Sequence, residues 1–202
     1  MEDAYYIIAH ETSYELKVKG SRFIGECFIV TSTEEAMASL ETVRKREHAA
    51  THHCFAYRVG LFDDMKFKYS DDGEPSGTAG RPIYDSICGR NLENVLVVVT
   101  RYFGGTKLGT GGLARAYSDA AVGVLDKVGR KKNYLTKRYH VEIDFALFDQ
   151  LTRLLHRYKA HQVKADYSDH VTLEIDIRLT MSEALVKEIV QLSGGKAKIE
   201  PL

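Results

Sequence analysis

Residues 95–117, VLVVVTRYFGGTKLGTGGLARAY, decide how the first half of the chain folds. The run Val-Leu-Val-Val-Val at 95–99 is apolar on both faces of a strand, which is typical of a central strand. A glycine-rich turn follows, and the residues after it place one apolar face on a helix: Leu113, Ala116, Tyr117, Ala120, Val124 and Val128. The stretch therefore predicts a central strand, a glycine turn and an amphipathic helix.

The residues before this stretch predict more strands and one further helix. We expect strands near residues 14–19, 22–30, 53–60 and 66–70. Ser32, with Glu35 three residues later, predicts a capping box at the start of a helix that runs to about Glu47. A loop of turn formers, DDGEPSGTAG, occupies residues 71–80. We expect an α/β sandwich in which the helices cover one face of a sheet.

The last third of the chain has a clearer pattern. The predicted strands are 141–145, with Val141, Ile143 and Phe145 on one face, and then 162–167, 171–179 and 196–200. One predicted helix carries Phe148, Leu151, Leu155 and Tyr158, and a second begins at a capping Ser182 and ends at Gly194. The order βαββαβ is the ferredoxin-like arrangement. We predict an α+β protein with two domains.

The boundary between the domains is marked by charge. Residues 130–138 contain five basic side chains and no acidic one. We place the domains at 1–134 and 135–202, joined by a short linker that can itself form a strand.

Composition excludes several classes of protein. Among the 202 residues, 28 basic and 28 acidic side chains give a net charge of zero, which argues against binding polyanions by bulk charge. The longest apolar run, 95–99, is too short to span a membrane. Three cysteines without a CxxC pair imply neither a disulfide framework nor a zinc site, and no secretory signal is evident, so we expect a cytoplasmic protein.

The glycine-rich turn suggests a site for an anion. A strand that ends in glycines and opens a helix exposes backbone N–H groups at the positive end of the helix dipole. The predicted phosphate or RNA-backbone contacts are Gly104, Gly105, Gly109, Gly111, Gly112, Arg81, Arg101, Lys107 and Arg115. The alternative is that the glycines only shape a tight connection. The spacing does not fit a P-loop, and the long turn argues against a Rossmann site.

The other polar residues leave several interpretations open. Asp71, Asp72 and Glu74 lie in one loop, where they could bind a metal, act as acid and base, or be solvated turn residues. Alternatively, Asp72 or Glu74 could pair with Arg101 or Arg81 and order the loop without chemistry. The histidines at 48, 52 and 53 do not have zinc spacing, so we predict no metal and no cofactor. A second basic face, formed by Arg153, Arg157 and Lys164, is either an RNA contact or an ordinary solvated helix face.

Four stretches together resemble the YigZ/IMPACT family. They are KGSRFI at 19–24, ATHHCFAYR at 50–58, DDGEPSGTAGRP at 71–82 and TRYFGGTKLGTGGLARAY at 100–117. The resemblance implies a ribosomal protein S5 domain 2-like fold for the first domain. It also implies a ferredoxin-like second domain similar to a terminal domain of elongation factor G. Eukaryotic IMPACT proteins regulate translation, but they carry an additional domain, so their partner is not carried over.

From the residues and the resemblance together, we expect a non-enzymatic protein that binds RNA, the ribosome or a translation factor, and that regulates translation. One alternative is an enzyme that acts on a small phosphorylated metabolite at the glycine-rich site, with Asp72 or Glu74 as base. The other alternative is a protein-protein adaptor. We expect no membrane partner, and the sequence does not predict an oligomeric state.

Overall fold

The structure is a computed structural model that describes residues 3–202. The chain divides into two compact units. The N-terminal unit is Tyr5–Lys132, and the C-terminal unit is Asn133–Leu202 together with Asp3 and Ala4. β1 (Ala4–Ile8) and β7 (Arg130–Tyr134) pair in a two-stranded sheet, and the division falls within these two strands.

The N-terminal unit is built on a five-stranded antiparallel sheet with β6 in the middle. In spatial order the strands are β2 (Thr12–Val18), β3 (Ser21–Ile29), β6 (Val95–Tyr102), β4 (His52–Val59) and β5 (Lys66–Ser70). A short 3-10 helix, η1 (Phe62–Asp64), connects β4 to β5. The strands predicted from the sequence are confirmed, and so is the central position of the strand that begins at Val95.

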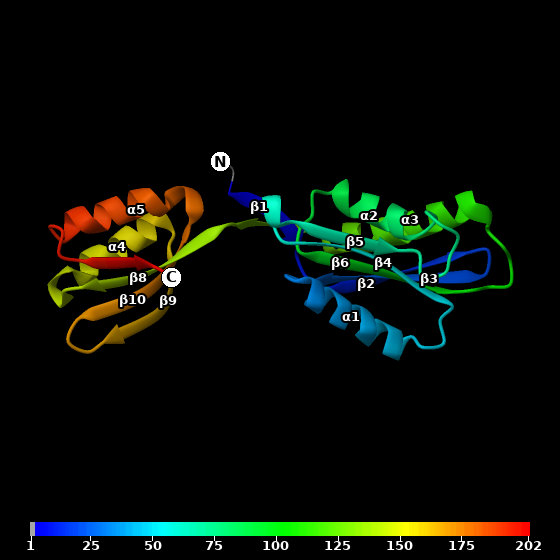
Figure 1. The fold of residues 1–202 in the computed structure, drawn as a ribbon, viewed down its shortest axis with the longest axis horizontal. Helices are drawn as coiled ribbons and strands as arrows, with labels where there is room; N and C mark the ends of the chain where they lie inside the picture. The colour runs from blue at the N-terminus through cyan, green and yellow to red at the C-terminus, as the bar shows by residue number, and fades with distance from the viewer. Residues whose placement is uncertain (1–2) are drawn as a thin grey trace. The chain divides into compact units, whose positions relative to one another are not determined.

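Helices cover both faces of this sheet. α2 (Gly80–Cys88) and α3 (Gly109–Val128) lie on one face, and α1 (Thr33–Arg46) lies on the other (Figure 1). Val97 and Val99 pack under α2 and α3, whereas Leu96 and Val98 pack against α1. The expectation that helices cover one face was therefore wrong, because a central strand that is apolar on both sides needs cover on both sides. The helix α2 was not predicted.

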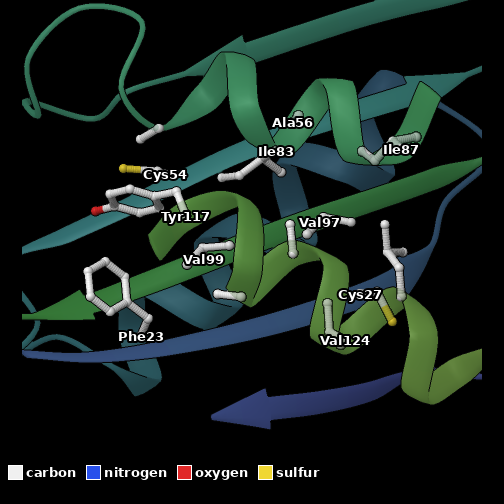
Figure 2. Packing of buried hydrophobic residues seen from close by; sticks show 14 of the residues in the cluster. Phe23, Cys27, Cys54, Ala56, Ile83, Ile87, Val97, Val99, Tyr117 and Val124 are labelled. Atoms are coloured by element: carbon white, nitrogen blue, oxygen red, sulfur yellow. The ribbon is translucent and has the colours of Figure 1, made fainter. Parts of the chain in front are cut away.

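α3 packs closely on the sheet and is the main element of the larger core. Tyr117 is fully buried, and its ring meets Phe23 edge to face with ring centres 5.1 Å apart. Figure 2 shows the Tyr117 ring between Phe23 and Cys54. A Cβ atom at Gly25 of β3 would lie 2.6 Å from the Ala120 carbonyl oxygen, so this glycine allows the helix to approach the strand.

The start of α1 fits half of the predicted capping box. The Ser32 hydroxyl accepts a hydrogen bond from the Glu35 N–H at 3.1 Å. The Glu35 carboxylate, however, accepts from the Thr31 N–H at 2.7 Å, one residue before the N-cap.

The C-terminal unit has the predicted order βαββαβ. Its elements are β8 (Thr136–Ile143), the 3-10 helix η2 (Phe145–Leu147), α4 (Phe148–Tyr158), β9 (His161–Tyr167), β10 (Val171–Arg178), α5 (Leu179–Leu192) and β11 (Lys198–Pro201). The antiparallel sheet has the order β11-β8-β10-β9, which is the ferredoxin-like topology. α4 and α5 pack on one face of this sheet (Figure 1).

Two local predictions in this unit were wrong. Phe145 lies beyond the end of β8, in η2, and is 48% exposed. Ser182 does not cap α5, because the helix begins at Leu179 directly after β10. The Ser182 hydroxyl instead donates a hydrogen bond to the Leu179 carbonyl oxygen at 2.8 Å, within the first turn. No helix between residues 3 and 202 is long and apolar enough to cross a membrane.

Candidate functional site: two glycine-rich helix starts

Both glycine-rich segments leave the same end of the N-terminal sheet. β5 and β6 are each antiparallel to β4, so they run in the same direction and end at the same side. The loop 71–80 follows β5 and leads into α2, and the loop 103–108 follows β6 and leads into α3. Two helix N-termini are therefore presented at this end of the sheet.

The start of α2 is filled by a carboxylate of the chain itself. Asp71 accepts hydrogen bonds from three backbone N–H groups, those of Gly77 at 2.8 Å, Ala79 at 2.9 Å and Gly80 at 2.8 Å. A helix start leaves such N–H groups without intrahelical partners, and a carboxylate is favoured there by the helix dipole. Asp71 therefore satisfies this site internally.

Asp72 also holds the loop. Its carboxylate accepts from the His53 N–H at 2.7 Å and from the Arg44 guanidinium at 2.9 Å. Its carbonyl oxygen lies 2.7 Å from His52 Nδ1. Asp72 thus anchors the loop to β4 and α1, and its carboxylate is already occupied by these contacts.

Glu74 forms a buried ion pair with Arg101. Arg101 Nη1 donates to Glu74 Oε1 at 2.5 Å, and their side chains are only 6% and 4% exposed. The Tyr117 hydroxyl donates to the same oxygen at 2.8 Å. Of the interpretations left open by the sequence, the ordering ion pair is the one realised between Glu74 and Arg101.

Arg101 is consequently not a surface contact for an anion, and the prediction that it belongs to the anion site was wrong. Its guanidinium lies over the rings of Phe23 and Phe103, 5.5 Å from each ring centre. Burial raises the pKa of the Tyr117 phenol and of the neighbouring Cys54 thiol. Both groups therefore stay protonated in neutral solution.

Arg81 has an ion pair of its own. It lies in the first turn of α2 and donates to Asp85 at 2.7 Å, one turn later in the same helix. Arg81 therefore belongs to the surface of α2 and not to the start of α3.

The start of α3, in contrast, has no internal cap. The N-cap residue is Leu108, and no side chain caps the helix within the described part of the chain. Gly109, Thr110 and Gly111 are exposed in the first turn. Lys107 and Arg115 flank this turn, both exposed, and neither has an ion-pair partner among residues 3–202. We call these five residues the α3 start.

The glycines of this region have different roles. A Cβ atom at Gly104 would lie 1.9 Å from the Gly20 carbonyl carbon, so Gly104 serves the packing of two backbones. Gly105 and Gly109 have φ values of +85° and +74°, which favour glycine. Gly112 would place its Cβ 3.2 Å from that of Leu108. Gly111 is different, because it has ordinary helical geometry and nothing within 4 Å of a Cβ.

Lys19 is a further exposed cation near this site that was not predicted from the sequence. It lies in the turn between β2 and β3, whose next residue, Gly20, packs against Gly104 of the glycine loop. Lys19 is exposed, and no carboxylate in the described residues pairs with it. The signal available in the sequence was its place directly before Gly20 in the KGSRFI stretch.

The second predicted basic face is mostly neutralised. Arg157 pairs with Glu188 of α5, and Lys164 lies 3.9 Å from Glu174. Only Arg153 of the three has no ion-pair partner in the part of the chain that the structure describes. No group of three or more His, Cys, Asp or Glu side chains within residues 3–202 is arranged to hold a metal ion.

Comparisons with known proteins agree with this architecture. The family described as "Impact N-terminal domain" matches residues 19–125, and the family described as "Domain of unknown function (DUF1949)" matches residues 141–196. These matches define a two-domain protein in which an Impact domain precedes a ferredoxin-like domain. The chain belongs to the IMPACT family, as the four sequence stretches indicated.

Relatives match over the whole length. "IMPACT family member YvyE" of Bacillus subtilis is 32% identical over 99% of this chain and 92% of that protein. "IMPACT family member YigZ" of Escherichia coli is 29% identical over 98% of this chain and 97% of that protein. A solved structure titled "Crystal structure of an hypothetical protein" has a TM-score of 0.72 and 28% identity, covering 100% of this chain and 98% of the other.

Proposed function

We propose that this chain is a non-enzymatic regulator of translation that binds RNA, free or within the ribosome, at the α3 start. The observation that carries the proposal is the uncapped first turn of α3 beside two unpaired cations, Lys107 and Arg115. Free backbone N–H groups at the positive end of a helix dipole favour phosphate. Lys19, in the adjoining turn, adds a third cation.

RNA fits this surface better than a protein partner. The α3 start offers amide donors and mobile cationic side chains, which are the groups that contact phosphate and sugar in nucleic-acid complexes. A stable protein interface would instead present a patch with an apolar, tightly packed centre. The resemblance to IMPACT proteins supports a role in translation.

The carboxylates proposed as alternative catalytic groups have structural roles. Asp72 is tied to Arg44 and His53, and Glu74 to Arg101 and Tyr117. Each would have to break strong hydrogen bonds before it could accept a proton from a substrate. These contacts favour binding over catalysis at this end of the sheet.

Binding to ribosomes and to structured ribosomal RNA across a salt series tests the proposal. We expect the variant Lys19→Gln/Lys107→Gln/Arg115→Gln to bind about 100-fold more weakly at low salt, with a salt slope reduced by about 2–3. The matched control Lys131→Gln/Lys187→Gln/Lys196→Gln removes the same charge from exposed lysines elsewhere and should bind like the wild type. Equal losses in both variants, or capture of a nuclease-insensitive protein partner with no RNA binding, would contradict the proposal.

A further inference from the structure

The strand β5 has an unusual surface for the border of a sheet. Its sequence, KFKYS, alternates basic and aromatic residues, and four of its five residues are exposed. Phe67 and Tyr69 are 52% and 39% exposed. In the sheet order β5 has a neighbour, β4, on one side only. Successive residues of a strand point to opposite faces, so Phe67 and Tyr69 lie on the α2 side of the sheet and Lys66 and Lys68 on the α1 side. We call these four residues and Tyr84, which lie along the free border of the sheet, the β5 edge.

The aromatic rings of the β5 edge form one continuous group. Tyr84 of α2 lies 4.9 Å from Phe67 and 5.7 Å from Tyr69 between ring centres, with interplanar angles of 29° and 36°. Tyr84 therefore stacks on Phe67 and lies tilted against Tyr69, so it contacts both rings of the strand. Half-exposed aromatic rings that pack against a third ring are the kind of platform on which nucleic-acid bases stack.

The charge of the strand agrees with a polyanion. Lys66 and Lys68 are exposed, and neither lies within ion-pair distance of a carboxylate in residues 3–202. Lysines on a border strand also discourage pairing with a second strand. That effect explains the lysines, but it does not explain why aromatic rings remain exposed on the other face of the strand.

We infer that the β5 edge binds unpaired bases of single-stranded RNA, with bases stacking on Phe67 and Tyr69 on one face and the backbone crossing the free border of the sheet, where Lys66 and Lys68 contact phosphates from the other face. The inference rests on the proposed function in that the partner is RNA, and it adds a second contact with a different chemistry. Bases in a duplex are stacked on one another and are not available to these rings. The β5 edge therefore selects single-stranded regions.

Three probes of about ten nucleotides separate base stacking from phosphate binding. They are a single-stranded RNA, its duplex, and an abasic strand with the same backbone. The variant Phe67→Leu/Tyr69→Leu keeps apolar side chains but removes the aromatic faces. We expect it to bind the single strand about tenfold more weakly and the abasic strand unchanged. Lys66→Gln/Lys68→Gln should weaken the binding of both.

Phe145→Leu is the matched control, because Phe145 is 48% exposed and lies in the C-terminal unit. It should bind all three probes like the wild type. A melting temperature near that of the wild type shows that the leucine variant is folded. If the melting temperature of the leucine variant is clearly lower, two other measurements test the inference. They are the RNA binding of Lys66→Gln/Lys68→Gln and the preference of the wild type for the single-stranded RNA over the abasic strand.

The outcomes distinguish this inference from the proposed function. If the wild type binds all three probes equally and the leucine variant is unchanged, the β5 edge does not bind bases, while the α3 start can still bind phosphate. If the wild type binds no RNA in any form, both proposals fail. Tighter binding of an acidic, strand-forming peptide along β5 than of any RNA would overturn the β5 inference in favour of a protein partner.

Discussion

The two helices on one face of the N-terminal sheet begin in opposite ways. At the start of α2, the Asp71 carboxylate accepts hydrogen bonds from three backbone N–H groups. The start of α3 has no such cap among the described residues. Both starts follow glycine-rich loops at the same end of the sheet. The difference teaches that glycines before a helix do not by themselves make an anion site. What decides is whether the chain supplies its own anion.

The surrounding charges show the same contrast. Near α2, each predicted cation has an acidic partner: Arg101 pairs with Glu74, and Arg81 pairs with Asp85. At the α3 start, Lys107 and Arg115 remain unpaired among residues 3–202. The loop 71–80 is thus a structural unit, and the α3 start is the surface left open to a partner.

The largest expected effect is on the buried ion pair. Glu74→Ala leaves the Arg101 guanidinium buried without a counter-ion, so we expect a loss of about 3–5 kcal/mol in the free energy of unfolding, measured by urea denaturation. Lys107→Ala, at the α3 start, should change it by less than about 0.5 kcal/mol. Similar effects of the two substitutions would remove the distinction between a structural loop and an open surface.

The next effect concerns the cap of α2. Asp71→Ala leaves three N–H groups without their acceptor, and we expect a loss of about 2–3 kcal/mol in stability. Asp71→Asn keeps one carbonyl oxygen and should lose about half as much. Equal stability of the alanine variant and the wild type would show that solvent satisfies these N–H groups as well as Asp71 does.

Smaller effects on stability, of opposite sign, are expected for alanine substitutions at Gly104 and Gly111. Gly104→Ala forces a Cβ against the backbone of Gly20 and should cost about 1–3 kcal/mol. Gly111→Ala has open space and helical geometry, so it should stabilise the protein by about 0.5–1 kcal/mol. Thermal unfolding of both variants checks the opposite signs, and destabilisation by Gly111→Ala would mean that the fold itself requires this glycine.

Much of the fold could be predicted from the sequence, because over long segments the spacing of apolar residues and the positions of turn residues indicate the same strands and helices. α2 was missed because its nine residues begin with Gly80 and contain Pro82, both of which suggest a loop. Pro82 is tolerated because it lies in the first turn, where its N–H is not needed. α1 was predicted as a helix, but its place on the second face was not; that place could have been inferred, since Leu96 and Val98 of the central strand also require a cover.

The site was harder to predict because burial decides what a charge does. Arg101 follows Val97 and Val99 at the spacing of one strand face, so its side chain lies on the same face as α3. That alternation was visible in the sequence and indicates burial. The partner Glu74 could only be proposed, since the sequence does not show which loop carboxylate reaches the strand. The KGSRFI stretch draws attention to Lys19, but its place near the α3 start follows from the contact between Gly20 and Gly104, which only the structure gives.

The affinity of Gly111→Asp for structured ribosomal RNA, at fixed ionic strength, tests the open α3 start most directly. The helix dipole stabilises an acidic side chain in the first turn, so this variant should have a higher melting temperature. The same carboxylate would occupy the place proposed for the phosphate. We predict that Gly111→Asp binds about tenfold more weakly than the wild type. The control Gln191→Glu adds the same charge at an exposed position of α5 and should show no such loss. Unchanged affinity of Gly111→Asp would contradict the account.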